Sequence, residues 1–347
     1  MNEINQKIIN AVIKRAEKLC PDSLLLVGLY GSAATGDLHG KSDIDLLILI
    51  GDEKGQQLAE GFILRNIGIG YDIYCTTWEM LEWDASLPHA HLSKLLDAPL
   101  IYIKDESAKE RLEALREKAR ADLRSDLRFE KSAAAFEKAK MMYADACLCD
   151  SFGEMRANAG AAISFLLDAV MLFHGKYFKK GVKRTFEEIR ELHLSFPMED
   201  MIMAVILAKT EDELRSNLKI LIKAAAVHLF PKKEKKQPIE ENLWGTYEEM
   251  FSNWRNKMPE AAENHDVYSS FMIMVSFWFM LREVAEDIAI DVPEIMGEFD
   301  AEDLQKNSEV FDAALEKYLS EYRKIGMEPM VYENADAFIA HYTNEPK

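Results

Sequence analysis

The sequence has few cysteines, no long apolar run and no excess of basic residues, and each shortage excludes a class of protein. Four cysteines in 347 residues cannot form the disulfide framework of a small secreted domain. The longest apolar run, residues 271–281, is too short to cross a bilayer, and the charged first segment lacks the pattern of a signal peptide. We therefore expect a protein of the cytoplasm that contacts no membrane.

The charge balance bears on the partners of the chain. Its 42 Lys and Arg residues face 60 Asp and Glu residues, which gives a formal net charge of −18. Such a surface repels a polyphosphate backbone, so no long nucleic acid is expected as a substrate. The same field attracts and concentrates a cationic acceptor.

The hydrophobic pattern changes along the chain and predicts three regions. Residues 1–105 alternate short apolar runs with helical stripes, which is typical of an α/β (α+β) domain with a small mixed sheet. Residues 106–232 have the pattern of an all-α helical bundle, and a polar linker over residues 231–238 precedes a second helical region, 239–347. The predicted strands are 24–30, 44–50, 71–76 and 100–103; the predicted helices are 4–19, 55–67, 77–84, 90–97, 105–125, 128–150, 153–175, 183–195, 197–208, 210–229 and 267–290.

One short segment carries the chemistry. Gly31 ends an apolar strand and lets the backbone approach a ligand, while Ser32 offers a hydroxyl and an N–H to a phosphate oxygen. Asp43 and Asp45 are two residues apart on an extended strand, so their side chains point to one face. Two adjacent carboxylates need a cation, and hard oxygen ligands suit Mg²⁺ bound together with phosphates.

A third carboxylate completes this arrangement. Asp72 follows Tyr71 near the start of the next predicted strand, between apolar neighbours. A buried strand carries an isolated aspartate only where the side chain is paired or binds a ligand. The alternative is an aspartate at a strand edge in contact with solvent.

The string from Gly31 to Leu46 resembles the signature of the DNA polymerase β-type nucleotidyltransferase superfamily: Gly-Ser, a spacer of about ten residues, Asp-x-Asp and a third Asp. The resemblance implies a catalytic fold over residues 1–105 and two Mg²⁺ ions. It also implies a nucleoside triphosphate as substrate, with ATP as our first choice. Thr35 stands where many members carry an arginine, which removes one phosphate contact. The implied ligands are Asp43 and Asp45 for both ions, Asp72 for the catalytic ion, and Gly31 and Ser32 for the nucleotide. Lys41 and Ser42 in the same loop are further candidates for the nucleotide, and the alternative for Lys41 is a solvated loop lysine.

The helical region is similar to the C-terminal bundle of kanamycin-type aminoglycoside nucleotidyltransferases and to HEPN domains. The similarity lies in residues 143–146, 156–158 and 172–178. In the antibiotic-modifying enzymes a bundle carboxylate serves as general base, and Asp145 is nearest to that position, with Asp150 and Glu154 as rivals. The alternative for Asp145 is a solvated carboxylate on a helix face.

These features lead to one hypothesis and several rivals. The chain is predicted to transfer a nucleoside monophosphate from a triphosphate to a hydroxyl of a small-molecule acceptor, with an aminoglycoside-like molecule as the first choice, and to release pyrophosphate. Rivals are an antitoxin-type enzyme that modifies a protein, for which a shorter chain is expected, and a non-catalytic nucleotide-binding protein. Residues 239–347 either complete the acceptor pocket or mediate a homodimer. The acceptor, the preferred nucleotide and the general base stay open.

Overall fold

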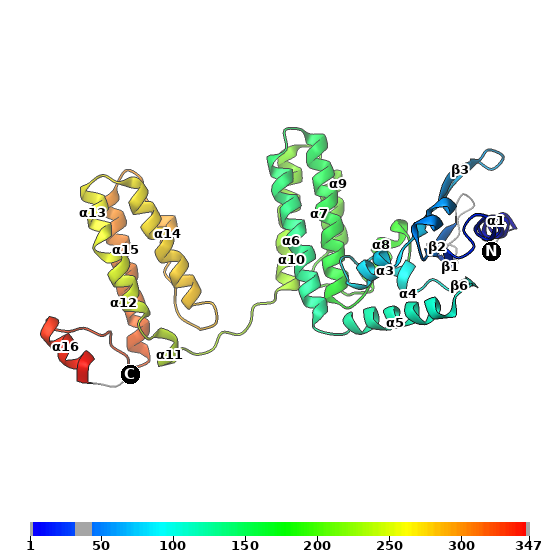
Figure 1. The fold of residues 1–347 in the computed structure, drawn as a ribbon. Coiled ribbons are helices and arrows are strands. Elements are labelled where there is room, and N and C mark those ends of the chain that lie inside the picture. Colours follow the sequence, from blue (N-terminus) through cyan, green and yellow to red (C-terminus); the bar gives the residue numbers. More distant parts are fainter. Residues whose placement is uncertain (1–2, 32–43, 345–347) are drawn as a thin grey trace. The chain divides into compact units, whose positions relative to one another are not determined.

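The computed structural model of the chain describes residues 3–31 and 44–344 and divides them between two compact units (Figure 1). Four of the predicted site residues, Ser32, Lys41, Ser42 and Asp43, lie outside the described residues. The first unit is Met1–Pro231 and the second is Lys232–Lys347, so the boundary falls within the predicted polar linker. The division of the first unit at residue 105 stays a prediction.

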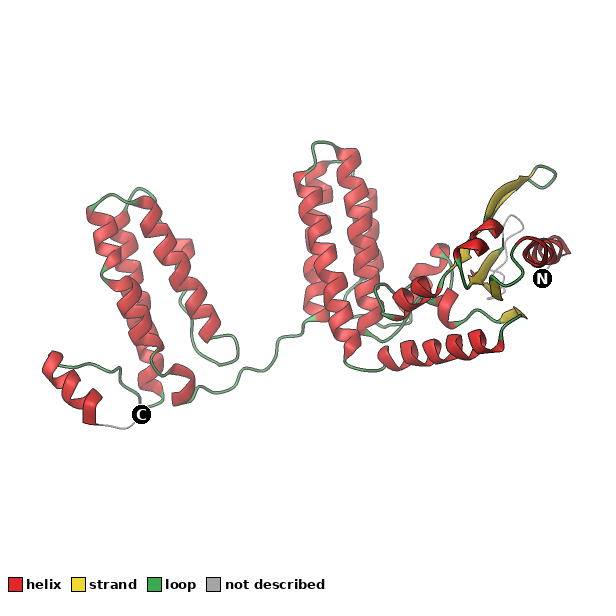
Figure 2. Cartoon of the chain, viewed as in Figure 1, coloured by secondary structure: helices red, strands yellow, loops and turns green. Residues whose placement is uncertain are grey.

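A small mixed sheet forms the start of the first unit, as predicted (Figure 2). Its strand order is β5-β2-β1-β6, with β1 antiparallel to both β2 and β6, and β2 parallel to β5. Both faces of β1 and β2 are covered, which explains why their sequences are almost continuously apolar. The strands are β1 Leu24–Tyr30, β2 Asp45–Ile50, β5 Cys75–Thr76 and β6 Leu100–Ile103.

The two faces of this sheet belong to different cores. On one face, Leu46 and Ile48 pack with helix α1 Glu3–Leu19 and with a separate hairpin of β3 Glu60–Leu64 and β4 Ile69–Ile73. On the other face, Leu47 and Leu49 belong to one continuous cluster that includes helices α3 Trp78–Ala85 and α4 Ser93–Leu96 and reaches into the bundle.

Two predicted elements of this region are wrong. The helix expected over residues 55–67 is a short 3-10 helix, η1 Glu53–Leu58, followed by strand β3. Pairing with β4 overrides the helical spacing, because Phe62 stacks on Tyr71 across the hairpin with ring centroids 5.3 Å apart. The strand expected over 71–76 is divided between β4, which pairs in the hairpin, and β5, which pairs in the main sheet.

An antiparallel helical bundle completes the first unit, as predicted (Figure 1). Gly175, at φ +62°, lies two residues after the end of α7 Phe152–Phe173, and Pro197 directly precedes α9 Met198–Leu207. The helix predicted over 183–195 is only six residues long. The bundle helices are α6 Leu127–Leu148, α7 Phe152–Phe173, α8 Thr185–Arg190, α9 Met198–Leu207 and α10 Glu211–Leu229.

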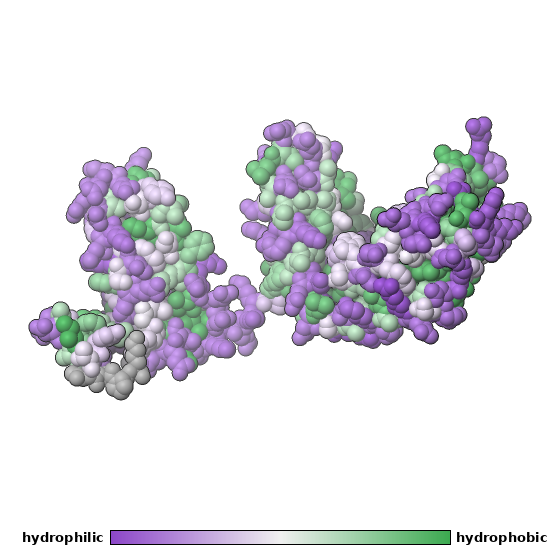
Figure 3. Space-filling view, in the orientation of Figure 1, coloured by the Kyte–Doolittle hydropathy of each residue, from purple (hydrophilic) through white to green (hydrophobic). Residues whose placement is uncertain are grey.

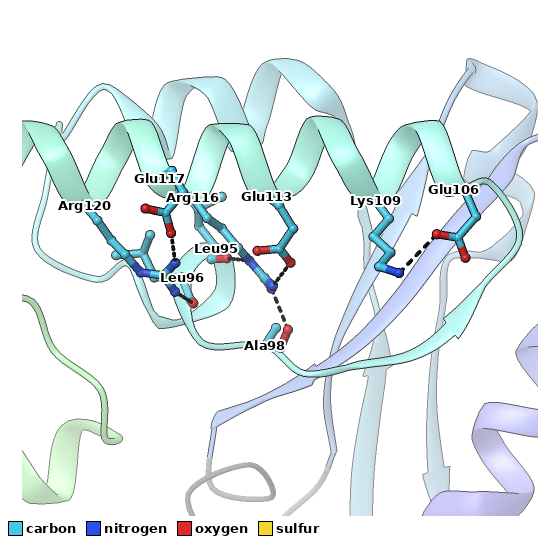
Figure 4. Close-up of polar contacts among 9 residues, drawn as sticks. All are labelled: Leu95, Leu96, Ala98, Glu106, Lys109, Glu113, Arg116, Glu117 and Arg120. Atoms are coloured by element: carbon cyan, nitrogen blue, oxygen red, sulfur yellow. Dashed lines mark hydrogen bonds and ion pairs between the residues drawn. The ribbon is translucent and has the colours of Figure 1, made fainter.

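Helix α5 Glu106–Asp122 joins the sheet to the bundle and is fixed by two arginines (Figure 4). Arg116 is buried, and its guanidinium donates to the carbonyl oxygens of Leu95 and Ala98 at 2.7 and 2.5 Å. Arg120 donates to the carbonyl oxygen of Leu96 at 2.7 Å. These bonds satisfy carbonyl groups at and beyond the end of α4, where no helical partner exists. Helix α5, whose charged sequence is typical of a simple connector, therefore supports residues 95–98 at and beyond the end of α4.

A chain of side-chain hydrogen bonds closes one end of the bundle. His174 follows α7 and His228 lies in the last turn of α10, with their Nε2 atoms 2.9 Å apart. The Nδ1 atom of His228 lies 2.9 Å from the hydroxyl of Ser195. Burial lowers the pKa of both imidazoles, and their mutual repulsion lowers that of His174 further. The folded state thus favours neutral rings.

The second unit is helical and has a core of its own. Phe277, Phe311 and Tyr318 are fully buried in it. Lys236 of the predicted linker is attached to this unit, because its N–H donates to Asp287 O at 2.9 Å and its carbonyl accepts from Ala289 N at 2.8 Å. The helices are α11 Glu240–Leu243, α12 Thr246–Met250, α13 Lys257–Glu263, α14 Val267–Val284, α15 Leu304–Lys324 and α16 Ala335–Asn344, with a π-helical turn at Phe251–Arg255.

Among the described residues, two helices, α7 and α14, are long and apolar enough by length and composition to cross a membrane. The apolar segment 271–281 lies within α14, which ends at Val284 and is shorter than the predicted helix 267–290. Leu166 and Val170 of α7 are fully buried in the first unit, and Phe277 and Leu281 of α14 in the second. Core helices pass the same test of length and composition, so the two are weak evidence for a membrane segment. The visible surface in Figure 3 mixes hydrophilic and hydrophobic residues over the bundle.

Replacing Arg116 tests the support that α5 gives. We expect Arg116→Ala to lower the free energy of unfolding of the first unit by about 2–4 kcal/mol, because buried carbonyl groups lose charged donors. Lys109→Ala on the same helix removes only an exposed ion pair with Glu106 and should change it by less than about 0.5 kcal/mol. Chemical denaturation of both variants is the measurement, and equal losses would contradict the proposed support.

The histidine chain predicts a pH dependence of stability. Because the folded-state pKa values lie below the unfolded value of about 6.5, the stabilising contribution is complete above that pH. It is lost as the pH falls towards the folded-state values, since the unfolded chain then binds more protons. We expect His228→Gln to weaken the drop in the free energy of unfolding between pH 7.5 and 5.5. His193→Asn, at an exposed position with φ +52° that asparagine tolerates, is the control. Unchanged pH dependence in His228→Gln would refute the assignment.

Candidate active site

The site begins where the last residue of β1 lies beside the first residue of β2. Tyr30 and Asp45 are paired across the two strands, and Gly31 follows with φ +66°, a conformation that favours glycine. A Cβ atom on Gly31 would overlap the Asp45 carboxylate and lie 2.7 Å from its Cγ. The absence of a side chain at 31 is therefore what gives this carboxylate its place.

A cavity of about 670 Å³ opens beside Asp45. Its walls come from the strand ends, from α3 and the segment after it, and from the loop after α7, all within the first unit. Because Asp45 lies on the same side of β2 as Leu47 and Leu49, its side chain faces the bundle side of the sheet. The lining residues are Tyr30, Gly31, Asp45, Glu79, Met80, Trp83, Asp84, His89, His91, Ser93, Lys94, Lys179, Lys180 and Gly181.

A buried carboxylate organises the wall formed by α3 and α4. Asp84 is only 6% exposed, and its oxygens lie 3.4 Å from His89 Nε2 and 3.5 Å from Lys94 Nζ. The other ring nitrogen of His89, Nδ1, accepts from the backbone N–H of His91 at 3.2 Å. The ring proton of a neutral His89 therefore sits on Nε2, facing Asp84. The three side chains hold one another and fix the backbone of residues 89–91.

The bundle meets the same segment through Asp168 of α7. This carboxylate is 4% exposed, and its Oδ1 accepts from the backbone N–H of Ala90 at 2.8 Å. His91 Nε2 lies 3.9 Å from the same oxygen, and the His91 ring stacks on Phe178. Burial raises the pKa of Asp168, while the Ala90 hydrogen bond and the nearby histidines oppose that rise.

The loop after α7 places two lysines in the cavity lining, next to the His89–His91 segment, because the N–H of Phe178 donates to the carbonyl oxygen of Ala90 at 2.8 Å. The backbone N–H groups of Lys179 and Lys180 donate to the two carboxylate oxygens of Glu188 at 2.9 and 3.2 Å. Glu188 is buried on α8, so it holds the loop by its backbone and leaves both lysine side chains on the cavity. Lys180 also lies 3.5 Å from Glu187.

Asp72 is exposed and lies in the separate hairpin. It pairs with Gly61 of β3, whereas the strand beside β2, β5, begins only at Cys75. Its neighbours Tyr71 and Ile73 pack into the core on the α1 face, so the Asp72 side chain points away from that core. Asp72 belongs to the hairpin strand β4 rather than to a buried strand, and it is not among the described residues that line the cavity.

Asp145 is not brought to this cavity. Ser132 of α6 donates to the carbonyl oxygen of Ala169, next to Asp168, whereas Asp145 lies 13 residues further along α6. At 1.5 Å per residue this is about 20 Å along the helix. The rivals Asp150 and Glu154 lie beside the α6–α7 turn at that same far end (Figure 1).

The residues that a metal ion could use lie around Asp45. A carboxylate oxygen is a suitable ligand for Mg²⁺, and the bare backbone of Gly31 forms a cradle that a Cβ atom would fill. No group of three or more His, Cys, Asp or Glu side chains arranged for a metal occurs among residues 3–31 and 44–344. The predicted ligand set of Asp43, Asp45 and Asp72 stays a prediction, because Asp43 lies outside the described residues and Asp72 does not line the cavity.

Sequence reasoning missed most of the cavity. Asp84, His89, His91 and Asp168 were not singled out, although three of them left a signal. Asp168 stands inside the apolar run Phe165–Phe173, where an isolated carboxylate needs a partner. His89-Ala90-His91 places two imidazoles just after Pro88; the helix predicted over 90–97 is confined to Ser93–Leu96, and both histidines lie in the loop before it.

Comparison with known proteins gives one family match and similar solved structures. Residues 9–130 match the family model described as a nucleotidyltransferase domain. Among solved structures, the chain is similar to a nucleotidyltransferase-like protein from Exiguobacterium sibiricum. The two are 14% identical with a TM-score of 0.33, over 70% of this chain and 84% of that chain. No curated protein matches the chain. The matched residues include Gly31, Asp45 and Asp72, and the N-terminal part of the chain, residues 9–130, is a nucleotidyltransferase domain.

Proposed function

We propose that the chain is a metal-dependent nucleotidyltransferase that transfers a nucleoside monophosphate to a hydroxyl of a small-molecule acceptor. The observation that carries this proposal is the fit of the Asp45 carboxylate against Gly31, inside a nucleotidyltransferase domain and at the edge of a cavity. ATP is the first choice of nucleotide. We place the enzyme in the cytoplasm, with a homodimer as a compatible state.

The dimensions of the cavity support a small acceptor. A volume of about 670 Å³ lies in the range of small-molecule sites, about 300–1,000 Å³. The walls combine the apolar surfaces of Trp83 and Met80 with polar groups of both signs. The net charge of −18 favours a cationic, aminoglycoside-like acceptor, but the local lysines mean that selectivity depends on individual contacts in the cavity.

The proposed reaction is an in-line displacement. The acceptor hydroxyl loses its proton, its oxygen forms a bond to the α-phosphorus, and the bond from that phosphorus to the pyrophosphate oxygen breaks. Gly31 and Ser32 would hold the triphosphate, with Lys41 and Ser42 nearby in the sequence. Lys179 and Lys180, which line the cavity, would attract the negative charge of the triphosphate. Asp45, with Asp43 and Asp72, would hold Mg²⁺, which neutralises developing charge and lowers the pKa of the acceptor hydroxyl.

Removing the Asp45 charge tests the metal-dependent chemistry. We expect Asp45→Asn to reduce pyrophosphate release from Mg·ATP by about 1,000-fold or more, since a lost metal ligand costs several kcal/mol in the transition state. Asp22→Asn, at a side chain that is 97% exposed, is the control and should keep the wild-type rate.

Isothermal calorimetry of ATP binding to the same proteins separates the rival functions. Tight binding of ATP by wild type without turnover, across small-molecule and protein acceptors, would favour a nucleotide-binding protein.

Replacing Gly31 tests the contact itself. Gly31→Ala introduces a methyl group that displaces the Asp45 carboxylate, so we expect at least a 100-fold loss of pyrophosphate release. Gly68→Ala is a matched control, because Gly68 has φ +65° and open space around its missing Cβ. Backbone strain lowers the free energy of unfolding of both variants by about 1–2 kcal/mol, but only Gly31→Ala disturbs the site. Equal activity of the two variants would show that the contact has no catalytic role.

A further inference from the structure

Two histidines line the cavity, and they are held in different ways. His89 has a partner at each ring nitrogen: the N–H of His91 at Nδ1 and the Asp84 carboxylate at Nε2. Its edge also packs against Trp83, with ring centroids 4.9 Å apart. A proton transfer at His89 would break these contacts, so His89 serves to position the segment.

His91 keeps one ring nitrogen available. Its side chain is 55% exposed and lines the cavity, while its ring stacks on Phe178 with centroids 4.9 Å apart and planes inclined by 23°. Nε2 faces Asp168 at 3.9 Å, and no hydrogen bond to Nδ1 is found among residues 3–31 and 44–344. The stacking contact fixes the plane of the ring, and the carboxylate fixes which edge faces the protein.

Asp168 is built into the fold at this point. An aspartate with apolar neighbours on a core helix is stable only with polar partners, and here these are the Ala90 N–H and the two histidines. Because Ala90 immediately precedes His91, one carboxylate sets both the backbone and the ring of the next residue. The other charged groups near the pair are Lys138 of α6 and, in the cavity lining, the lysines Lys94, Lys179 and Lys180 and the carboxylates Asp45, Glu79 and Asp84.

We propose that His91 accepts the proton of the acceptor hydroxyl in the transfer reaction, and that Asp168 is its positioning residue. This inference rests on the proposed function. The O–H bond breaks as the proton moves to Nδ1 of a neutral His91, the oxygen forms its bond to the α-phosphorus, and pyrophosphate departs with the electron pair of the broken P–O bond. Asp168 stabilises the resulting imidazolium, which then gives its proton to water.

The other polar groups of the cavity are less suited to this role. Asp84 is already paired with Lys94 and His89, and Asp45 is on the side proposed to hold metal. The lysines favour the neutral form of a nearby imidazole, and Asp168 offsets them by favouring the charged form after proton transfer. Imidazole is also the side chain whose charge normally changes between pH 5 and 8.

The test uses the full-length protein with Mg·ATP and two probe acceptors, kanamycin and glycerol. We expect His91→Gln to lower kcat about 100-fold with little change in KM for ATP, and to remove the acidic limb of the wild-type pH profile of kcat. His91→Ala should be partly restored by added imidazole, which a structural role would not explain. His193→Asn, at an exposed position, should match wild type.

A second readout follows the pair without catalysis. In NMR titrations of the histidine Cε1–H signals, Asp168→Asn should lower the midpoint of His91, because the amide keeps an acceptor for Ala90 N–H but removes the charge. Wild-type kcat and pH profile in His91→Gln would overturn the inference and leave the proposed function standing. An unshifted midpoint would overturn the role of Asp168. Absence of pyrophosphate release from wild type would refute the proposed function, while the NMR shift would still establish the His91–Asp168 pair.

Discussion

The close approach between Gly31 and Asp45 is the constraint on which the site depends. The antiparallel pairing of β1 and β2 brings Tyr30 opposite Asp45, and the next residue must then turn beneath a carboxylate. Only glycine combines φ +66° with the space that this carboxylate occupies. The buried, nearly continuous apolar runs of the two strands keep that pairing in register, because a slip by one residue would turn Asp45 into the other core.

The rest of the cavity depends on buried and partly buried charges that act through the backbone. Arg116 and Arg120 of α5 hold carbonyl groups near α4, Asp168 holds the N–H of Ala90, and Glu188 holds two N–H groups of the 179–181 loop. Each charged group is fixed by a helix of the first unit, while the loops that it holds carry the cavity side chains. Rigid helices thus position irregular segments, which is a common way of building a site.

The sequence predicted the buried strands and the bundle helices better than it predicted the residues that line the cavity. Regular apolar spacing identified β1, β2 and the bundle helices, because burial of one face leaves a local pattern. The hairpin of β3 and β4 was read as a helix, since the contact between Phe62 and Tyr71 is not local in sequence. The positions of Asp145 and Asp168 could not be distinguished either. Which end of α7 and α6 faces the sheet depends on tertiary packing that periodicity does not contain.

The single cluster that extends from Leu26, Leu47 and Leu49 into the bundle has a consequence for how this chain can be divided. A fragment that stops at residue 105 would expose the apolar underside of its own sheet to water, and it would be prone to aggregate through that surface. The nucleotidyltransferase signature therefore does not mark a portable module here. Exchange of this domain between chains would require the bundle to travel with it, because the sheet and the bundle share one core.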